Sequence, residues 1–134
     1  MDDAVPGPKP YPYSPVSRIS QFVAIHAYFR IETSHRETVG RLIGELELRA
    51  SENPLVLFHE ASFRSDDLAL RLAFPSAEPL LDHLAGTSDW FERLLTGTEL
   101  LRIEVHGPEH ELALLRGPLG VFMPEWYVVT APRS

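Results

Sequence analysis

The sequence predicts one α+β domain in which helices cover one face of an antiparallel sheet. Two observations lead to this prediction. Segments in which apolar residues alternate are interspersed with segments in which they recur every three or four residues, in the order βαββαβ. The chain is also 134 residues long and 44% hydrophobic, which suits a single domain with a packed core and argues against a disordered chain.

The N-terminal segment differs in composition from the rest of the chain. Residues 1–17 contain five of the twelve prolines and no apolar run, so we expect a flexible tail there and a single domain over residues 18–134. The start of the chain has no basic region of the kind that opens a secretory signal, and no stretch reaches the roughly 18 apolar residues of a membrane span. We therefore expect a soluble cytoplasmic protein.

The first strand is predicted at residues 22–31, where FVAIHAYFRI places an apolar residue at every second position. The opposite face of this strand mixes Phe22, His26 and Tyr28 with smaller and charged side chains. Such a mixture suits a ligand cavity or a solvent-facing surface better than a dry core.

The remaining elements follow from the same two periodicities. The first helix begins where Ser34 and Glu37 have the spacing of a capping box, and it ends before Pro54. In chain order we expect a helix at 35–51, strands at 55–63 and 68–74, helices at 76–86 and 88–95, a strand at 100–106, a short helix at 108–115 and a strand at 125–130.

This order is the ferredoxin-like βαββαβ pattern, in which one face of the sheet has no helices. Because Phe22 and Tyr28 would be exposed on that face, we expect a homodimer in which the sheets of two copies face each other and leave one small cavity per subunit. We also expect the last strand to reach across to the partner.

Charge and composition exclude several function classes. With 12 Lys and Arg against 19 Asp and Glu, the chain gains nothing from binding a phosphate backbone, so nucleic acid is not an expected partner. The lack of cysteine removes disulfides and thiolate chemistry. Phosphate-loop, dinucleotide and hydrolase-elbow motifs are missing, so no bound cofactor is implied. His106 and His110 are separated by a strand end and a turn, and we predict no metal site from them.

His26 and Tyr28 are the predicted catalytic residues. Two positions apart on a strand, their side chains leave the same face about 6.5–7 Å apart, so one ligand could touch both. Histidine is the usual general base near neutral pH, and tyrosine can orient or protonate an oxyanion. The structural alternative is a hydrogen-bonded histidine within the sheet or the dimer interface.

Four further residues are predicted to bind substrate. Phe22 shares the face of His26, and His59 lies on the more apolar side of the second strand. His83 belongs to the second helix, and Trp90 lies on a short apolar helix that could wall a hydrophobic pocket. Packing within the core is the alternative role for His83 and Trp90.

Several segments resemble a known superfamily. The strand FVAIHAYFRI, the hairpin LVLFHEASF…LALRLAF and the run FPSAEPLLDHL at 74–84 resemble the dimeric α/β-barrel superfamily, and within it the antibiotic biosynthesis monooxygenase-like domains, over about residues 20 to 130. The resemblance implies a homodimeric enzyme that oxygenates an aromatic or polyketide-like molecule without a cofactor. The first strand carries His26 where haem-degrading relatives have asparagine, and Trp90 follows His83, so haem chemistry is not implied.

Under this resemblance His26 would remove a phenolic proton, and the resulting carbanion would react with oxygen in a dry pocket lined by Phe22, Tyr28 and Trp90. Two alternatives stay open. A polyketide cyclase or isomerase of the same fold would use the same histidine and tyrosine to form an enolate without oxygen. A non-catalytic dimer would bind the ligand and leave it unchanged.

Overall fold

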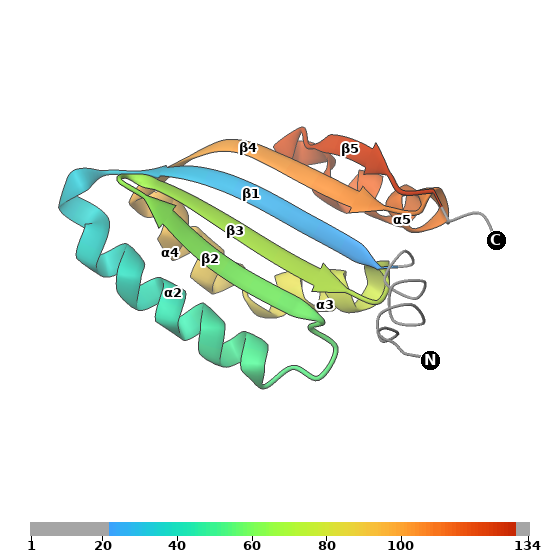
Figure 1. Ribbon diagram of the computed structural model, residues 1–134, viewed down its shortest axis with the longest axis horizontal. Helices are drawn as coiled ribbons and strands as arrows, with labels where there is room; N and C mark the ends of the chain where they lie inside the picture. Colours follow the sequence, from blue (N-terminus) through green and yellow to red (C-terminus); the bar gives the residue numbers. More distant parts are fainter. Residues whose placement is uncertain (1–21, 131–134) are drawn as a thin grey trace, which may run out of the picture.

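A computed structural model describes residues 22–130 of the chain, so the proline-rich segment 1–17 lies outside the described residues (Figure 1). The described part contains one five-stranded sheet of order β2-β3-β1-β4-β5. The strands are β1 (Val23–Ile31), β2 (Phe58–Arg64), β3 (Asp67–Phe74), β4 (Thr98–Gly107) and β5 (Glu125–Val128). The first four pair antiparallel and β5 pairs parallel with β4, so the predicted sheet is confirmed with a mixed edge.

The helices lie against one face of this sheet (Figure 1). They are α2 (Arg36–Ser51), α3 (Ala77–Gly86), α4 (Ser88–Thr96) and α5 (Glu109–Leu119), with 3-10 turns η1 (Thr33–His35) and η2 (Gly120–Phe122). The element order agrees with the βαββαβ prediction, and α5 and β5 are added after it. The α+β ferredoxin-like class is therefore confirmed.

The start of α2 differs from the expected capping box. A 3-10 turn precedes the helix, His35 takes the N-cap position, and no side chain caps the helix. The hydroxyl of Ser34 instead lies 3.3 Å from Nδ1 of His35. The Ser34–Glu37 spacing therefore marks the right region of the chain but not the capping contact.

Two other boundaries also differ from the expectation. Strand β2 begins at Phe58 and not at residue 55, because the chain turns at residues 54 and 55, where Asn53 accepts the main-chain N–H of Leu55 at 3.0 Å and that of Val56 at 3.1 Å. Helix α5 continues past the expected end at residue 115, because Leu119 is buried in the core at its last turn. Both differences arise from hydrogen-bonding or packing contacts, which the spacing of apolar residues in the sequence does not reveal.

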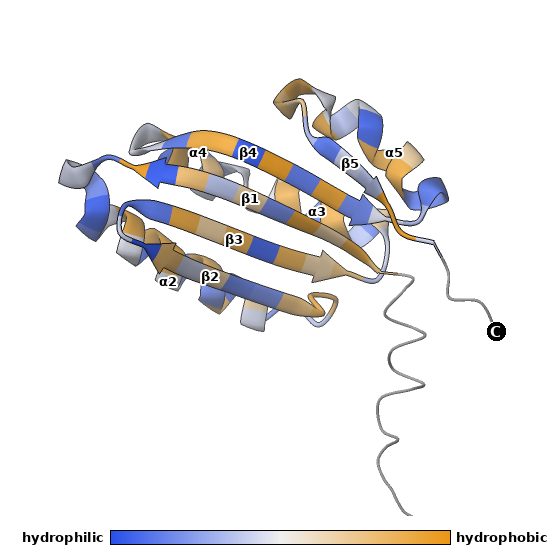
Figure 2. Ribbon diagram, turned by 45° about the horizontal axis from the view of Figure 1, so that its top comes forward, coloured by the Kyte–Doolittle hydropathy of each residue, from blue (hydrophilic) through white to orange (hydrophobic). Residues whose placement is uncertain are grey.

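Alternation along the strands separates a buried face from an open one (Figure 2). On the helix side, Ile25 and Phe29 of β1 are buried against apolar residues of the helices, such as Leu46 of α2 and Leu80 of α3. The other face has no helix among the described residues. It presents alternate side chains of all five strands, including His26, and most of them are polar.

The last strand pairs within its own chain. Glu125 lies opposite Glu104, and Tyr127 lies opposite His106, so β5 extends the sheet beyond β4. The expectation that this strand reaches across to a partner is therefore wrong for the chain as described: β4 offers an unpaired edge in the same chain, and a short αβ connection suffices to reach it. The dimer itself stays a prediction.

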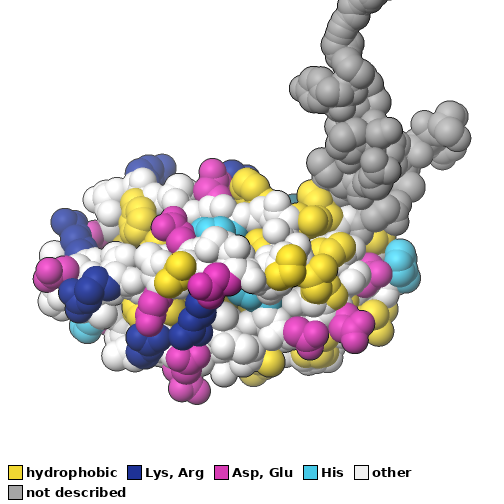
Figure 3. Space-filling model, turned by 90° about the horizontal axis from the view of Figure 1, so that it is seen from below, with side chains coloured by type: hydrophobic (Ala, Val, Ile, Leu, Met, Phe, Trp, Pro, Cys, Tyr) yellow, Lys and Arg dark blue, Asp and Glu magenta, His cyan; other side chains and the backbone are white. Residues whose placement is uncertain are grey.

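The surface mixes charges of both signs. On the side shown in Figure 3, basic side chains lie beside acidic ones, with apolar side chains between them. Arg93 contacts Glu45 at 3.0 Å, and Arg64 contacts Asp67 at 3.3 Å, as examples of this pairing. Within residues 22–130, no helix combines the length and the apolar character that crossing a membrane requires.

Candidate functional site

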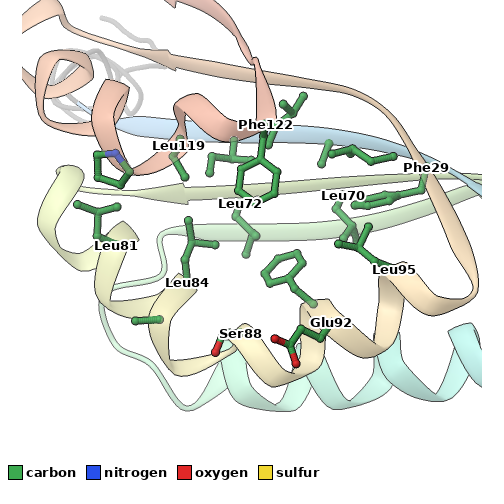
Figure 4. Close-up of a pocket in the computed structure, with 17 residues that line it drawn as sticks. Phe29, Leu70, Leu72, Leu81, Leu84, Ser88, Glu92, Leu95, Leu119 and Phe122 are labelled. Carbon is green, nitrogen blue, oxygen red and sulfur yellow. The ribbon is translucent and has the colours of Figure 1, made fainter.

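A cavity of about 440 Å³ lies between the sheet and the helices (Figure 4). Its floor is the helix-facing side of β1, β3 and β4, and its walls come from α3, α4 and the chain from the end of α5 into η2. The lining residues are Ile25, Ala27, Phe29, Leu70, Leu72, Leu100 and Ile103 of the sheet, Leu81, Leu84, Ala85, Ser88, Phe91, Glu92 and Leu95 of α3 and α4, and Pro118, Leu119 and Phe122. A cavity of this size holds a small organic molecule.

One helical stripe builds most of the wall. The lining residues of α3 and α4 recur every three or four positions from Leu81 to Leu95, which is the spacing of one helix face. The stripe stays in register across the break at Thr87, since the N–H of Thr87 bonds to the carbonyl of His83 and its own carbonyl accepts the N–H of Phe91. The two short helices therefore present a continuous surface to the cavity.

Ser88 and Glu92 are the only side chains with polar groups among the described residues that line the cavity. They lie one helical turn apart on α4, on the helix side of the cavity and opposite Leu70 and Leu72 of the sheet (Figure 4). Both residues are exposed, so they form the rim of the cavity, and such a lining suits a mainly apolar molecule with a polar group at that rim.

The predicted site residues do not line this cavity. Trp90 is fully buried, and its indole N–H donates a hydrogen bond to the main-chain carbonyl of Leu42, so it packs in the core between α4 and α2. Its neighbour Phe91 contributes the aromatic wall instead. Phe22 directly precedes β1 and is half-buried. Its role in binding stays a prediction.

His59 and His83 lie near each other, outside the cavity lining. His83 is buried, its ring packs against Phe74 at 5.3 Å, and its Nδ1 lies 3.5 Å from the side-chain nitrogen of Asn53. Its Nε2 has no hydrogen-bond partner among the described residues. Burial lowers the pKa of His83, and the positive charges of His59 and Arg49 lower it further.

A polar cluster lies on the open face of the sheet. His26 of β1 is directly opposite Glu104 of β4, and His106 lies two residues further along β4 on the same face. Atom Oε1 of Glu104 is 3.1 Å from Nε2 of His106 and 3.5 Å from Nδ1 of His26. The two imidazole rings stack at 4.7 Å. The Glu104 carboxylate is almost completely buried by these neighbours.

Further residues hold this cluster in place. Arg102 donates to the second oxygen of Glu104, and its guanidinium lies 4.6 Å above the ring of Tyr28. Tyr127 of β5 stacks on His106 at 4.5 Å, with the rings nearly parallel. The predicted pair of His26 and Tyr28 therefore does share one face, but Arg102 covers the tyrosine ring.

The environment sets the charges in the cluster. Burial lowers the pKa of His26, as does the neighbouring His106, while Glu104 acts in the opposite direction. Burial alone would raise the pKa of Glu104, but hydrogen bonds from His106 and Arg102 outweigh it, and the pKa lies below its ordinary value. Around neutral pH we therefore expect a charged glutamate beside a neutral His26.

The cavity and the cluster lie on opposite faces of the same strand. Ile25 and Ala27 of β1 form part of the cavity floor, and His26 between them points to the open face. This cavity is therefore on the helix side, and the cavity predicted between two sheets on the mixed face, which needs a second copy of the chain, stays a prediction. A molecule held in the cavity cannot touch His26, because the sheet lies between them.

Sequence signals for the missed residues did exist in part. The three- or four-residue spacing from Leu81 to Leu95 contains Ser88 and Glu92 within an apolar stripe, and this pattern could have marked a helix that faces a ligand. Glu104 and His106 alternate with apolar residues of β4 and so share a face. Their proximity to His26 depends on the pairing of two strands far apart in the sequence.

Comparison with solved structures shows which known fold the chain shares. The chain has the α+β fold of the antibiotic biosynthesis monooxygenase-like domains, which confirms the predicted resemblance. A Chloroflexus aurantiacus protein named as a candidate antibiotic biosynthesis monooxygenase superimposes with a TM-score of 0.54 at 17% identity, over 66% of this chain and 93% of that chain. Rv0793 of Mycobacterium tuberculosis superimposes with a TM-score of 0.57 at 16% identity, over 66% and 95%.

A more similar solved structure is MupZ from Pseudomonas fluorescens. It has a TM-score of 0.79 and 27% identity, and the alignment covers 86% of this chain and 90% of MupZ. The similarity thus extends over nearly the whole of both chains, beyond the roughly two thirds of this chain that the other two structures cover. No protein-family model and no curated protein matches the chain.

Proposed function

We propose that this protein is a small-molecule enzyme that binds an aromatic or polyketide-like substrate in the cavity between sheet and helices and acts on it by proton transfer, without a cofactor. The observation that carries the proposal is the cavity of about 440 Å³, whose apolar lining contains one carboxylate, that of Glu92, beside one hydroxyl, that of Ser88. An apolar wall with a few polar groups is typical of a substrate site.

Glu92 is the acid–base group in this proposal. The apolar body of the substrate packs against the sheet and Phe91, and its hydroxyl or carbonyl group lies at the Ser88 end. Glu92 accepts a proton from a phenol or from a carbon next to a carbonyl, and Ser88 donates a hydrogen bond to the oxygen that becomes negative. The apolar lining covers the body of the substrate, while Glu92 and Ser88 are exposed at the rim of the cavity.

Two reactions can follow from that anion, and we rank oxygenation first because one solved structure of the same fold is named as a candidate monooxygenase. The electron-rich carbon of a phenolate reacts with dioxygen as co-substrate: one oxygen atom enters the product, which becomes a quinone, and the other leaves as water. The substrate supplies all the electrons. Ring closure or isomerisation is the second candidate, because a single carboxylate can both take and return a proton, and this reaction consumes no oxygen.

The predicted pair of His26 and Tyr28 is the competing location for the chemistry. It is favoured by one observation, the contact of His26 with the buried Glu104, since a carboxylate beside an imidazole orients it as a base. A substrate for this pair would bind on the open face. The cavity remains our proposal because the sheet and the helices both contribute walls to it, whereas His26 lies on a face of the sheet that no described helix covers.

Variants on the two faces separate these locations. We would measure oxygen uptake with polycyclic phenols and follow β-keto thioesters by mass spectrometry. Glu92→Gln is expected to lower turnover by about 10²–10⁴-fold with the fold retained. Glu47→Gln, an exposed position on α2, is the matched control. Loss of turnover in His26→Ala with full activity in Glu92→Gln would overturn the proposal in favour of the open face.

The same measurements distinguish the reaction types. Oxygen uptake with a product that has gained one oxygen atom supports oxygenation, and an isomeric or dehydrated product without oxygen uptake supports the cyclase or isomerase. Saturable binding of the same compounds, with no product from any of them, would support the non-catalytic alternative and contradict an enzymatic role.

A further inference from the structure

We propose that His26, Glu104 and His106 form a binding site for a divalent transition-metal ion of the Zn²⁺ type on the open face of the sheet. One ligand atom from each residue, together three, lie within 4.8 Å of one another. Two imidazole nitrogens and one carboxylate oxygen are a donor set that zinc sites use, with a remaining position for water. The site is separate from the proposed cavity function, because the sheet lies between them.

The distances already approach those of a coordinated ion. Adjacent ligands of a tetrahedral zinc ion, with bonds of about 2.0–2.1 Å, lie about 3.3 Å apart. Oε1 of Glu104 is 3.1 Å from Nε2 of His106 and 3.5 Å from Nδ1 of His26. Two of the three ligand-to-ligand distances thus fit before an ion enters. The ligand nitrogens of the two histidines lie within 4.8 Å of each other and must approach when an ion binds.

The supporting contacts orient the ligands. Arg102 binds Oε2 of Glu104, which leaves Oε1 directed at both histidines. The ring of Tyr127 lies parallel to that of His106 at 4.5 Å and restricts its rotation. Outer contacts of this kind fix ligand geometry in metal sites and affect affinity strongly. The nearly complete burial of Glu104 further limits its alternative positions.

The protonation states also suit a cation. A metal ion requires neutral imidazoles and an ionised carboxylate. Burial lowers the pKa of His26, and the hydrogen bonds from His106 and Arg102 keep the pKa of Glu104 low. The positive charges of Arg71 and Arg102 act against a cation, so we expect weaker binding than in a site of the same ligands without neighbouring arginines.

The chain supplies a matched control. His110 is four residues from His106 in the sequence, but it lies on α5, is exposed and contacts Glu111 at 3.3 Å. It is therefore outside the cluster. Replacing His110 tests whether any surface histidine binds the ion, whereas replacing His26 or His106 tests the proposed site.

The experiment is a titration of the tag-free full chain, freed of metal by chelation, with Co²⁺ followed by visible absorption and with Zn²⁺ followed by calorimetry. We expect one ion per chain and the absorption of a nitrogen- and oxygen-ligated Co²⁺ ion. His26→Ala and His106→Ala should each weaken binding by at least about 10–100-fold. His110→Ala should bind as the unchanged protein does.

Two results would overturn the assignment. The first is no saturable binding by the unchanged protein. The second is unchanged affinity in both His26→Ala and His106→Ala, or a loss in His110→Ala, which would mean that the ion binds elsewhere. Circular dichroism of each variant shows whether it folds, and Glu104→Gln provides a third ligand variant if one of the histidine variants does not fold.

Discussion

The indole N–H of Trp90 donates a hydrogen bond to the main-chain carbonyl of Leu42 and so joins α4 to α2 within the core. The ring of Phe91 meets that of Trp90 edge-on at 4.8 Å. Phe91 lines the cavity, whereas Trp90 is fully buried behind it. Trp90 therefore positions the cavity wall and does not contact the ligand.

Trp90→Phe should lower the free energy of unfolding by about 1–3 kcal/mol, because the hydrogen bond to Leu42 and part of the buried indole are lost. Urea unfolding followed by circular dichroism measures this change. Trp126→Phe is the control, since Trp126 is only partly buried, and it should cost less. Equal losses in the two variants would contradict the assigned role of Trp90.

His83 should make the protein sensitive to acid. Burial holds the pKa of His83 below the unfolded value of about 6.5, so the unfolded chain takes up the proton first as the pH falls. The stability due to the neutral form is present above about pH 6.5 and is lost as the pH falls through the lower folded pKa. His83→Leu should therefore show a smaller decrease in melting temperature between pH 7.5 and 5.5.

At neutral pH the same variant should keep or slightly raise the stability, by up to about 1 kcal/mol, because it removes the buried Nε2 that lacks a partner. His110→Leu is the control, since His110 is exposed, and its acid response should match that of the unchanged protein. A pH response in His83→Leu as steep as in the unchanged protein would show that other groups cause the acid sensitivity.

Gly97 should not tolerate a larger side chain. A Cβ atom at this position would lie 2.7 Å from both Cβ and Cγ of His35, the last residue of η1 and the N-cap of α2. Gly97→Ala is therefore expected to lower the free energy of unfolding by about 1–3 kcal/mol. His35→Gly removes the clashing atoms, so the double variant should recover part of that loss in a double-mutant cycle.

Gly44 is the matched control for this substitution. It lies in the middle of α2, is exposed, and nothing lies within 4 Å of an added Cβ atom. Gly44→Ala should raise the stability by about 0.5–1 kcal/mol, the difference in helix propensity between the two residues. A destabilising Gly44→Ala, or additive effects of Gly97→Ala and His35→Gly, would contradict the explanation from the close contact.

A larger side chain at Ala85 should obstruct the cavity. Ala85 lines the cavity but is exposed on α3, so Ala85→Phe can extend into the opening without disturbing the core. Binding of the apolar dye Nile red, followed by fluorescence, should weaken by about tenfold, or 1.4 kcal/mol. Ala113→Phe, at an exposed position on α5 outside the lining, is the control and should bind normally. Equal affinity in the two variants would place the dye elsewhere.

The element order was predictable because its signals are local. Alternating residues such as Ile25 and Phe29 mark a strand, and the apolar spacing of α2 marks a helix, whatever the rest of the chain does. The same local alternation correctly placed His26 and Tyr28 on one face of β1. The predicted start of β2 at residue 55 was wrong. Asn53 accepts hydrogen bonds from the main chain of Leu55 and Val56, and the spacing of apolar residues does not reveal such contacts.

The location of each candidate site depends on contacts between segments that are far apart in the sequence. The sequence by itself determined an α+β chain with a mixed face on β1, because side-chain direction follows from the strand period alone. Only the tertiary structure decided that the cavity opens on the helix side, through the docking of α3 and α4 on the sheet. It also decided that His26 meets Glu104, since strand register brings together residues 78 positions apart, and no local pattern specifies that pairing.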